Sequence, residues 1–155
     1  MEAEGPDTAV SLRDVARADV DIFFEQECDP EALRRANFPA RDRPAFVDHW
    51  ERNILAAQTV RAQTVLAGTA VAGNVVAWWQ EGRREVGYWL GREYWGRGIG
   101  TRALTLFLQQ EAGRPLTATV DVNNAASIRL LTRCGFRTVE KISEDEREYF
   151  LLALD

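Results

Sequence analysis

Residues 94–101, which read Tyr-Trp-Gly-Arg-Gly-Ile-Gly-Thr, constrain the fold of this chain more than any other segment. They follow a predicted strand at residues 85–90 and overlap the start of residues 98–111, where apolar side chains recur with helical spacing. A strand, a glycine-rich turn and an amphipathic helix in this order predict an α/β unit. The helix N-terminus offers free N–H groups and a positive dipole end, which suit a phosphate or pyrophosphate.

Three specific interpretations of the glycine-rich turn can be considered: a P-loop, a Rossmann dinucleotide loop and a turn that binds no ligand. A P-loop requires Gly-Lys followed by Ser or Thr, which this chain lacks. A Rossmann loop is formally matched by residues 98–103, with Asp121 near the place of the ribose-binding acid. Several residues separate Leu90 from the glycines, however, and too little chain follows for further βαβ units. A turn without a ligand leaves three glycines and an arginine at a helix start without a packing reason.

In the remaining chain, segments with the apolar spacing of a β-strand alternate with segments that have the spacing of an α-helix. The predicted strands are residues 8–13, 60–66, 71–79, 85–90, 116–122, 136–142 and 149–154, and the predicted helices are residues 19–27, 30–36, 43–57, 98–111 and 125–134. Residues 143–146 form an acidic turn between the last two strands. This order predicts one α/β domain over residues 1–155, with a mostly antiparallel sheet, helices on both faces and one parallel crossover before the strand at 116–122.

Composition excludes several classes of function. The chain has 155 residues and a net charge of −5, which argues against nucleic acid as a partner, because phosphate backbones select basic surfaces. Cys28 and Cys134 lie far apart and His49 is the single histidine, so no metal site is expected. Two unpaired cysteines are typical of a protein in a reducing compartment.

No targeting or membrane segment is expected. Residues 1–7 are polar and acidic and lack the basic and apolar regions of a signal peptide. No apolar run approaches the roughly 20 residues that a membrane helix needs. These features predict a soluble, cytoplasmic protein without a membrane partner. The sequence leaves the oligomeric state open, with a homodimer among the alternatives.

Three ordered motifs resemble the GNAT superfamily of acyl-CoA-dependent N-acetyltransferases. Residues 94–104 are similar to the pyrophosphate-binding motif of that family, and residues 85–90 to its donor-binding strand. Residues 124–127 (Asn-Ala-Ala-Ser), followed by Leu130, Leu131 and Gly135-Phe136, resemble its second motif. The sequence Tyr-Trp-Gly-Arg-Gly most resembles the branch of the family that contains ribosomal-protein N-terminal acetyltransferases.

The resemblance implies a GNAT-like fold and acetyl-CoA as co-substrate, with no metal. It implies direct attack by a primary amine, from a small molecule or a protein N-terminus, in a ternary complex. Backbone groups of Trp89 and Leu90 are expected to bind the pantetheine arm, and the Asn124 side chain is expected near the donor. The amides expected to bind the pyrophosphate are those of Arg97, Gly98, Ile99, Gly100 and Thr101.

The chain departs from the family pattern at two positions. Relatives often carry Gln or Arg where this chain has Trp95, and a tyrosine that protonates the leaving thiolate where it has Leu131. The usual general acid is therefore absent. A catalytically inactive acyl-CoA-binding module is the alternative function that this second departure favours.

The expected catalytic residues are Glu85 and Ser127. Glu85 matches a position where relatives often carry a catalytic carboxylate, and burial beside aromatic side chains raises a carboxyl pKa towards neutral pH. The alternative is an exposed strand glutamate paired with Arg83 or Arg84. Ser127, Tyr94, Tyr88 and water remain candidates for the general acid, and Ser127 is also well placed to cap a helix.

Two further features are weaker indications of function. His49, on a predicted helix, is expected at the surface or in packing rather than in catalysis. Glu25, Glu27, Asp29 and Glu31 form an acidic run that would attract a cationic amine, although a solvated helix face explains the same run.

Overall fold

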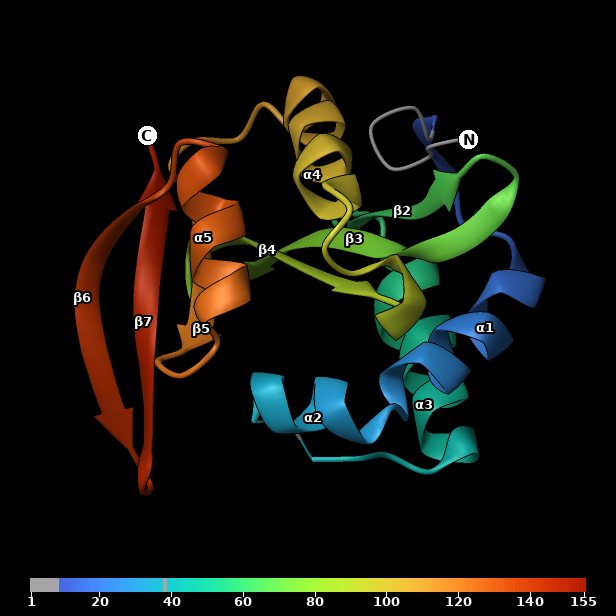
Figure 1. Cartoon of the computed structure of the whole chain (residues 1–155), viewed down its shortest axis with the longest axis horizontal. Coiled ribbons are helices and arrows are strands. Elements are labelled where there is room, and N and C mark those ends of the chain that lie inside the picture. Colours follow the sequence, from blue (N-terminus) through green and yellow to red (C-terminus); the bar gives the residue numbers. More distant parts are fainter. Residues whose placement is uncertain (1–8, 38) are drawn as a thin grey trace.

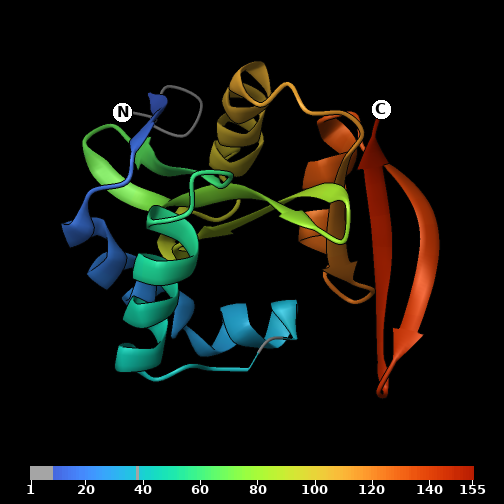
Figure 2. The ribbon, with the colours of Figure 1, turned by 180° about the vertical axis from the view of Figure 1, so that it is seen from behind.

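A twisted seven-stranded sheet runs through the computed structural model of the chain, with helices on both of its faces (Figures 1 and 2). The structure describes residues 9–37 and 39–155. The expectation for residues 1–7, and the predicted start of the first strand at residue 8, fall outside the described residues.

The secondary structure follows the predicted order closely. The strands are β1 (Val10–Asp14), β2 (Arg61–Ala67), β3 (Ala70–Gln80), β4 (Arg83–Leu90), β5 (Leu116–Asp121), β6 (Arg137–Glu144) and β7 (Arg147–Leu154). The helices are α1 (Arg17–Glu27), α2 (Pro30–Ala36), α3 (Arg43–His49), η2 (Trp50–Leu55), η3 (Arg92–Tyr94), α4 (Ile99–Gln110) and α5 (Ala125–Arg133).

The strands lie in the order β1-β2-β3-β4-β5-β7-β6. β4 and β5 form the one parallel pair of this sheet, and the other neighbours are antiparallel. The predicted mixed sheet with one parallel crossover is confirmed. A Rossmann sheet requires successive parallel βαβ units, so this topology rules that interpretation out. No helix within the described residues is long and apolar enough to cross a membrane.

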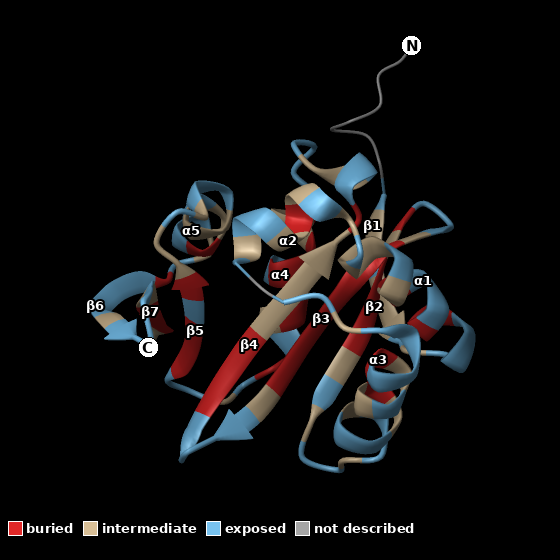
Figure 3. Ribbon diagram, turned by 90° about the horizontal axis from the view of Figure 1, so that it is seen from below, coloured by how far each residue is buried: buried red, intermediate tan, exposed pale blue. Residues whose placement is uncertain are grey.

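Each face of the sheet has its own apolar core (Figure 3). On one face α4 and α5 bury a cluster that includes Ile99, Phe107 and Leu131 against β3, β4 and β5. On the other face α1, α3 and η2 bury a smaller aromatic cluster that includes Phe23 and Trp50. The middle strands of the sheet are thus packed between two apolar layers.

Two local predictions are corrected. Residues 43–57 were predicted as one helix, but the α-helix ends at His49 and continues as the π-helical η2, where Trp50 remains buried in the aromatic cluster. The last hairpin turn is also shorter than residues 143–146. β6 extends through Glu144, and Asp145 and Glu146 both have positive φ, at 49° and 66°. A two-residue turn of this kind matches the twist of the paired strands.

A buried carboxylate joins α1 to β1 and β2. Asp19 accepts hydrogen bonds from the Arg13 guanidinium at 2.6 and 3.0 Å, from the Ala16 N–H at 2.8 Å and from the Thr64 hydroxyl at 2.8 Å. Burial alone would raise the pKa of this carboxyl, but these hydrogen bonds outweigh burial and lower the pKa. The charged form of Asp19 therefore stabilises the fold.

Replacing Asp19 by alanine is expected to lower the free energy of unfolding by about 2–3 kcal/mol, because several donors to a buried charge lose their acceptor. A lowered folded pKa means that this stabilisation is present above the unfolded pKa of about 3.9 and is lost as the pH falls through the folded value. Urea unfolding at several pH values measures it. Asp21→Ala is the control, since Asp21 forms an exposed ion pair with Arg43. Equal losses in the two variants at neutral pH contradict this account.

Candidate functional site

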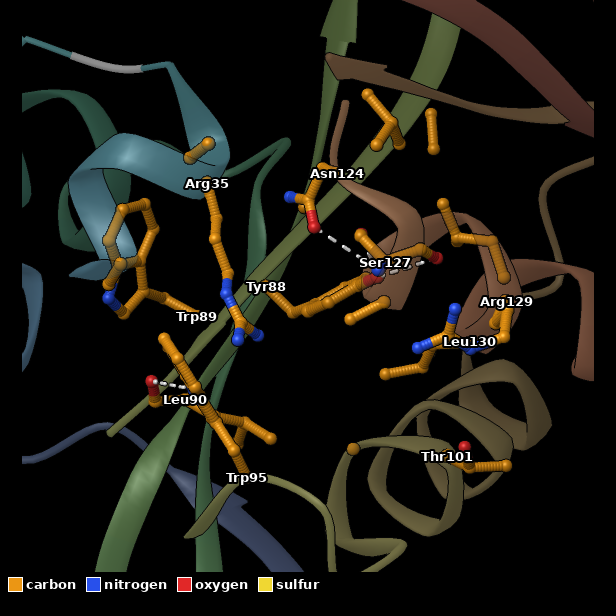
Figure 4. A pocket seen from close by; sticks show the side chains of 18 of the residues that line it. Arg35, Tyr88, Trp89, Leu90, Trp95, Thr101, Asn124, Ser127, Arg129 and Leu130 are labelled. Carbon is orange, nitrogen blue, oxygen red and sulfur yellow. Dashed lines mark hydrogen bonds between the residues drawn. The ribbon is translucent and has the colours of Figure 1, made fainter. Parts of the chain in front are cut away.

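A cleft opens where β4 and β5 separate. The two strands are paired only at Arg84 with Leu116 and at Glu85 with Thr117. Beyond these pairs β4 stays bound to β3 and β5 to β7, so the facing edges diverge. The cleft holds about 630 Å³, and its walls come from α2, α4, α5 and the glycine turn (Figure 4). This volume lies in the range of small-molecule sites.

The outer half of β4 offers its backbone to the cleft. A Cβ on Gly73 of β3 would lie 2.0 Å from the Trp89 carbonyl oxygen, so that carbonyl faces β3. Because backbone groups alternate between the two edges of a strand, those of Tyr88 and Leu90 face the cleft. The Trp95 indole N–H reaches the Leu90 carbonyl at 3.2 Å. Both residues expected to present backbone groups, Trp89 and Leu90, line the cleft, and Figure 4 shows the Trp89 side chain on its wall.

The glycine turn lies at the start of α4, facing the cleft. Gly98 is the N-cap with φ of 75°, and Gly96 has φ of 72°. Both are left-handed conformations that strain other residues, and a Cβ at either position would meet no atom within 4 Å. No side chain caps this end of α4 in the described structure. The first N–H groups of the helix therefore have no side-chain acceptor, and the residues that carry them, Ile99, Gly100 and Thr101, line the cleft, as an anion site requires.

Gly100 has a different role from the other two glycines. A Cβ there would lie 2.6 Å from Cδ1 of Leu130 and 3.2 Å from Cδ1 of Leu90. The missing side chain lets α5 approach α4, so this glycine is explained by helix packing. No packing reason for any of the three glycines is evident from the sequence, and for Gly100 the structure supplies one.

Arginines supply most of the charge around the cleft. Arg35, Arg129 and Arg133 line it, with Asp121 as the acidic residue among the lining residues. The Arg97 side chain turns back to donate to the Glu93 carbonyl at 3.2 Å and lies 5.7 Å from the Tyr94 ring centroid. Arg97 therefore contributes its backbone to the turn rather than a charge to the cleft wall. The positive balance suits an anionic ligand.

Asn124, Ser127 and Tyr88 meet on the α5 side of the cleft (Figure 4). The side-chain oxygen Oδ1 of Asn124 caps α5 by accepting a hydrogen bond from the Ser127 N–H at 3.3 Å. The Ser127 hydroxyl is hydrogen-bonded to the Tyr88 hydroxyl. Burial raises the pKa of Tyr88 to about 12, partly offset by the bond to Ser127. Thr101 also lines the cleft, and Ile99 is fully buried beneath the turn.

Glu85 lies at the inner end of the cleft, where β4 and β5 part. It is only 4% exposed, and the adjacent residues Val86 and Gly87 line the cleft, whereas Glu85 itself does not. Burial raises the pKa of its carboxyl, while Arg83, at 3.8 Å, and a hydrogen bond with Thr117 partly oppose that rise. The alternative of an exposed strand glutamate does not hold, although its ion pair with Arg83 does form.

The C-terminal end of α2 crosses the mouth of the cleft. The Arg35 guanidinium stacks 4.4 Å from the ring centroid of Trp95, on the β4 side. Asn37, the left-handed cap of α2, donates to the Asp121 carboxylate of β5 at 2.8 Å. Its carbonyl accepts from Arg147 of β7 at 2.9 Å. Helix α2 is therefore tied to both sides of the gap.

Two weaker expectations have clear outcomes in the structure. His49 is half-buried at the end of α3, hydrogen-bonded to Asn53 at 3.0 Å and away from the cleft lining. The carboxylates of the acidic run are engaged within the protein. Asp29 caps α2. The other three form ion pairs: Glu25 with Arg43, Glu27 with Arg41 and Glu31 with Arg35. Among residues 9–37 and 39–155, no three His, Cys, Asp or Glu side chains are grouped to hold a metal.

A family model described as an acetyltransferase (GNAT) domain matches residues 10–137. The chain belongs to the GNAT acetyltransferase family. A comparison with curated proteins found no match. The fold of solved acetyltransferase structures agrees with this assignment.

Solved structures share the GNAT fold over nearly the whole chain. RimL, a ribosomal L7/L12 alpha-N-protein acetyltransferase in complex with coenzyme A, has a TM-score of 0.78 at 19% identity, covering 95% of this chain and 93% of that chain. Spermidine N-acetyltransferase from Vibrio cholerae, in complex with CoA and spermine, has a TM-score of 0.79 at 13% identity, covering 94% of each chain. The aminoglycoside acetyltransferase AAC(6')-Ib, in complex with coenzyme A, has a TM-score of 0.74 at 20% identity, covering 94% of each chain.

Several residues of this GNAT cleft were not found by sequence reasoning. Arg129 and Arg133 are spaced by four residues, which places them on one face of a helix, and this spacing was the available signal. No local sequence signal marks Arg35, Asn37 or Asp121, because their contacts join segments that are far apart in the chain. Leu131, at the position of the missing tyrosine, is fully buried in the core on the α4 and α5 side.

Proposed function

We propose that this protein is an N-acetyltransferase that transfers an acetyl group from acetyl-CoA to a primary amine by direct attack in a ternary complex. The observation that carries the proposal is the uncapped N-terminus of α4, with its left-handed glycines, facing a cleft between β4 and β5. The structural relatives are named for acetylation of a protein α-amine, of spermidine and of aminoglycosides. These names support an amine acceptor, either a small molecule or a protein N-terminus.

The residues of the cleft suit the parts of acetyl-CoA. The backbone groups of Tyr88 and Leu90 would pair with the amides of the pantetheine arm, as another strand would. The N–H groups from Arg97 through Thr101 would bind the pyrophosphate, since they combine free donors with the helix dipole. Arg129 and Arg133 add positive charge on the α5 wall, and Asn124 holds the start of α5 beside the donor.

The chemistry assigned to this site needs no covalent intermediate. Glu85 accepts the proton that the amine loses, directly or through water, and its raised pKa suits a base working near neutral pH. The amine nitrogen attacks the thioester carbon, and N–H groups on the edge of β4 polarise its carbonyl oxygen. The C–S bond then breaks and sulfur keeps the electron pair. Ser127 donates a proton to that sulfur.

Donor binding is tested by thermal unfolding. A ligand that binds only the folded state at 100 times its Kd stabilises by about 2.7 kcal/mol. In a domain of this size CoA is then expected to raise Tm by about 5–10 °C. NADH and ATP at equal concentration serve as controls and are expected to have a much smaller effect. A larger shift with NADH than with CoA contradicts the donor assignment.

An acyl-CoA-binding module without catalysis is the second candidate. The observation that favours it is Leu131, a buried apolar side chain where relatives often carry the acid. Thiol release from acetyl-CoA, measured with a panel of amines and N-terminal peptides, separates the two functions. Turnover with any member of the panel establishes an enzyme, whereas CoA binding without turnover across the panel favours the module.

We propose the cytoplasm as the location of this activity. Cys28 and Cys134 are free thiols, which fits a reducing compartment. The partners proposed are the amine and the donor alone, without nucleic acid or membrane, and the net charge of −5 agrees with the first exclusion. Size-exclusion chromatography with light scattering distinguishes a monomer from a homodimer.

A further inference from the structure

A pair of hydroxyl groups bridges the two walls of the cleft. The Tyr88 hydroxyl, from β4, is hydrogen-bonded to the Ser127 hydroxyl, from α5, and lies 3.4 Å from the Ser127 carbonyl oxygen. Figure 4 shows both groups at the edge of the open space. The Tyr88 ring packs against the core under α4 and α5, which fixes the direction of its hydroxyl. Both residues line the cleft.

The hydrogen bond between the two hydroxyls can run in either direction, because each group can donate and accept. Tyr88 has a single phenol proton with two possible acceptors, the Ser127 hydroxyl and, at 3.4 Å, the Ser127 carbonyl oxygen, and the hydroxyl is the closer of the two. With its pKa raised to about 12, Tyr88 keeps that proton throughout the physiological pH range. The Asn124 side chain holds the Ser127 backbone N–H. In the direction that the proposed acetyl transfer requires, Tyr88 donates to the Ser127 hydroxyl, which leaves the Ser127 proton free to point into the cleft.

We propose that Tyr88 is a positioning residue that makes Ser127 a proton donor to the departing sulfur. This inference rests on the proposed acetyl transfer. As the C–N bond forms and the C–S bond breaks, sulfur takes the Ser127 proton and Ser127 takes the phenol proton of Tyr88. The phenolate then recovers a proton from solvent, which balances the proton that Glu85 removed from the amine. The products are the amide and the free thiol.

The Tyr88–Ser127 pair supplies the proton that Leu131 of α5 cannot supply. Leu131 has no exposed surface and carries no proton to donate. Tyr94, the other tyrosine at the cleft, lies beside the glycine turn with its ring 5.7 Å from Arg97, towards the pyrophosphate end. A serine alone is a weak acid, and a phenol bonded to it lowers the cost of losing its proton.

The experiment compares two donors that differ in the basicity of their leaving group. Acetyl-CoA releases a thiolate that gains from protonation, whereas acetyl-seleno-CoA releases a selenolate that departs without it. Tyr88→Phe, which keeps the ring, is expected to lower kcat about 10-fold with acetyl-CoA and less than 2-fold with the selenoester. KM for the donor is expected to stay constant. The loss in the double variant with Ser127→Ala is expected to equal that of Ser127→Ala alone, because Tyr88 acts through Ser127.

Tyr149→Phe is the matched control, since its hydroxyl bonds Glu144 on the last hairpin and lies outside the cleft lining. Equal losses with both donors in Tyr88→Phe, or additive losses in the double variant, reduce the pair to a structural link between β4 and α5 and overturn the inference. No release of thiol or selenol by the unmodified protein overturns the proposed function, and the inference with it. Unfolding curves confirm that each variant is folded.

Discussion

Replacing Glu85 by glutamine is expected to lower kcat by about 10²-fold or more, the usual contribution of a general base. Glutamine keeps the size and hydrogen-bonding shape of the side chain but accepts no proton near neutral pH. The KM for acetyl-CoA is expected to change little, because the donor contacts lie further along β4 and at the α4 N-terminus. Steady-state thiol release with a fixed amine measures both constants.

The pH dependence of this variant gives a second readout. In the unmodified protein, kcat is expected to rise with pH as the Glu85 carboxyl, whose pKa is raised by burial, loses its proton. The defect of Glu85→Gln is expected to shrink at higher pH, because more of the amine then arrives neutral. An unchanged kcat assigns the base elsewhere, and loss of CoA binding together with kcat makes Glu85 a structural residue.

Stability separates these outcomes from misfolding. A carboxyl with a raised folded pKa stabilises the fold most below its unfolded pKa, and this contribution is lost as the pH rises through the folded value. Near neutral pH the charged Glu85 therefore carries a burial cost that glutamine lacks. We expect Glu85→Gln to be as stable as the unmodified protein or more stable at pH 7, as measured by urea unfolding.

The donor end of the site could be predicted from the sequence because its signals are local. Glycines with positive φ, the strand before them and the helix after them lie within residues 85–111, where turn chemistry and periodicity both apply. The sequence could not separate the three glycines by role. Nothing in the sequence distinguishes Gly100 from Gly98. A side chain at position 100 would collide with Leu130, which lies nearby only because α5 packs against α4.

The other walls of the cleft depend on contacts between distant segments. Asn37 meets Asp121 from 84 positions away, and Tyr88 meets Ser127 from 39. Such pairs follow from where β5 and α5 pack, and no local pattern specifies them. The π-helical turn that begins at Trp50, whose side chain packs in the aromatic cluster, is likewise not specified by the helical period along the segment.

Replacing Gly98 by valine is expected to weaken CoA binding by about 10²-fold, roughly the loss of one or two hydrogen bonds to a charged group. Its φ of 75° is strained for any other residue, and the added side chain stands at the N-terminus of α4, where the pyrophosphate is proposed to bind. Isothermal titration with CoA measures the change in Kd.

Gly68 gives this experiment a matched control. It has φ of 63°, and a Cβ there also meets no atom within 4 Å, but it lies in the turn between β2 and β3, outside the cleft lining. Valine at either position is expected to lower the free energy of unfolding by a similar amount, about 1–3 kcal/mol, because the backbone strain is the same. Only Gly98→Val is expected to lose CoA affinity. Equal CoA affinities in the two folded variants would remove the glycine turn from the donor site, whereas a difference confined to binding assigns the turn to the pyrophosphate.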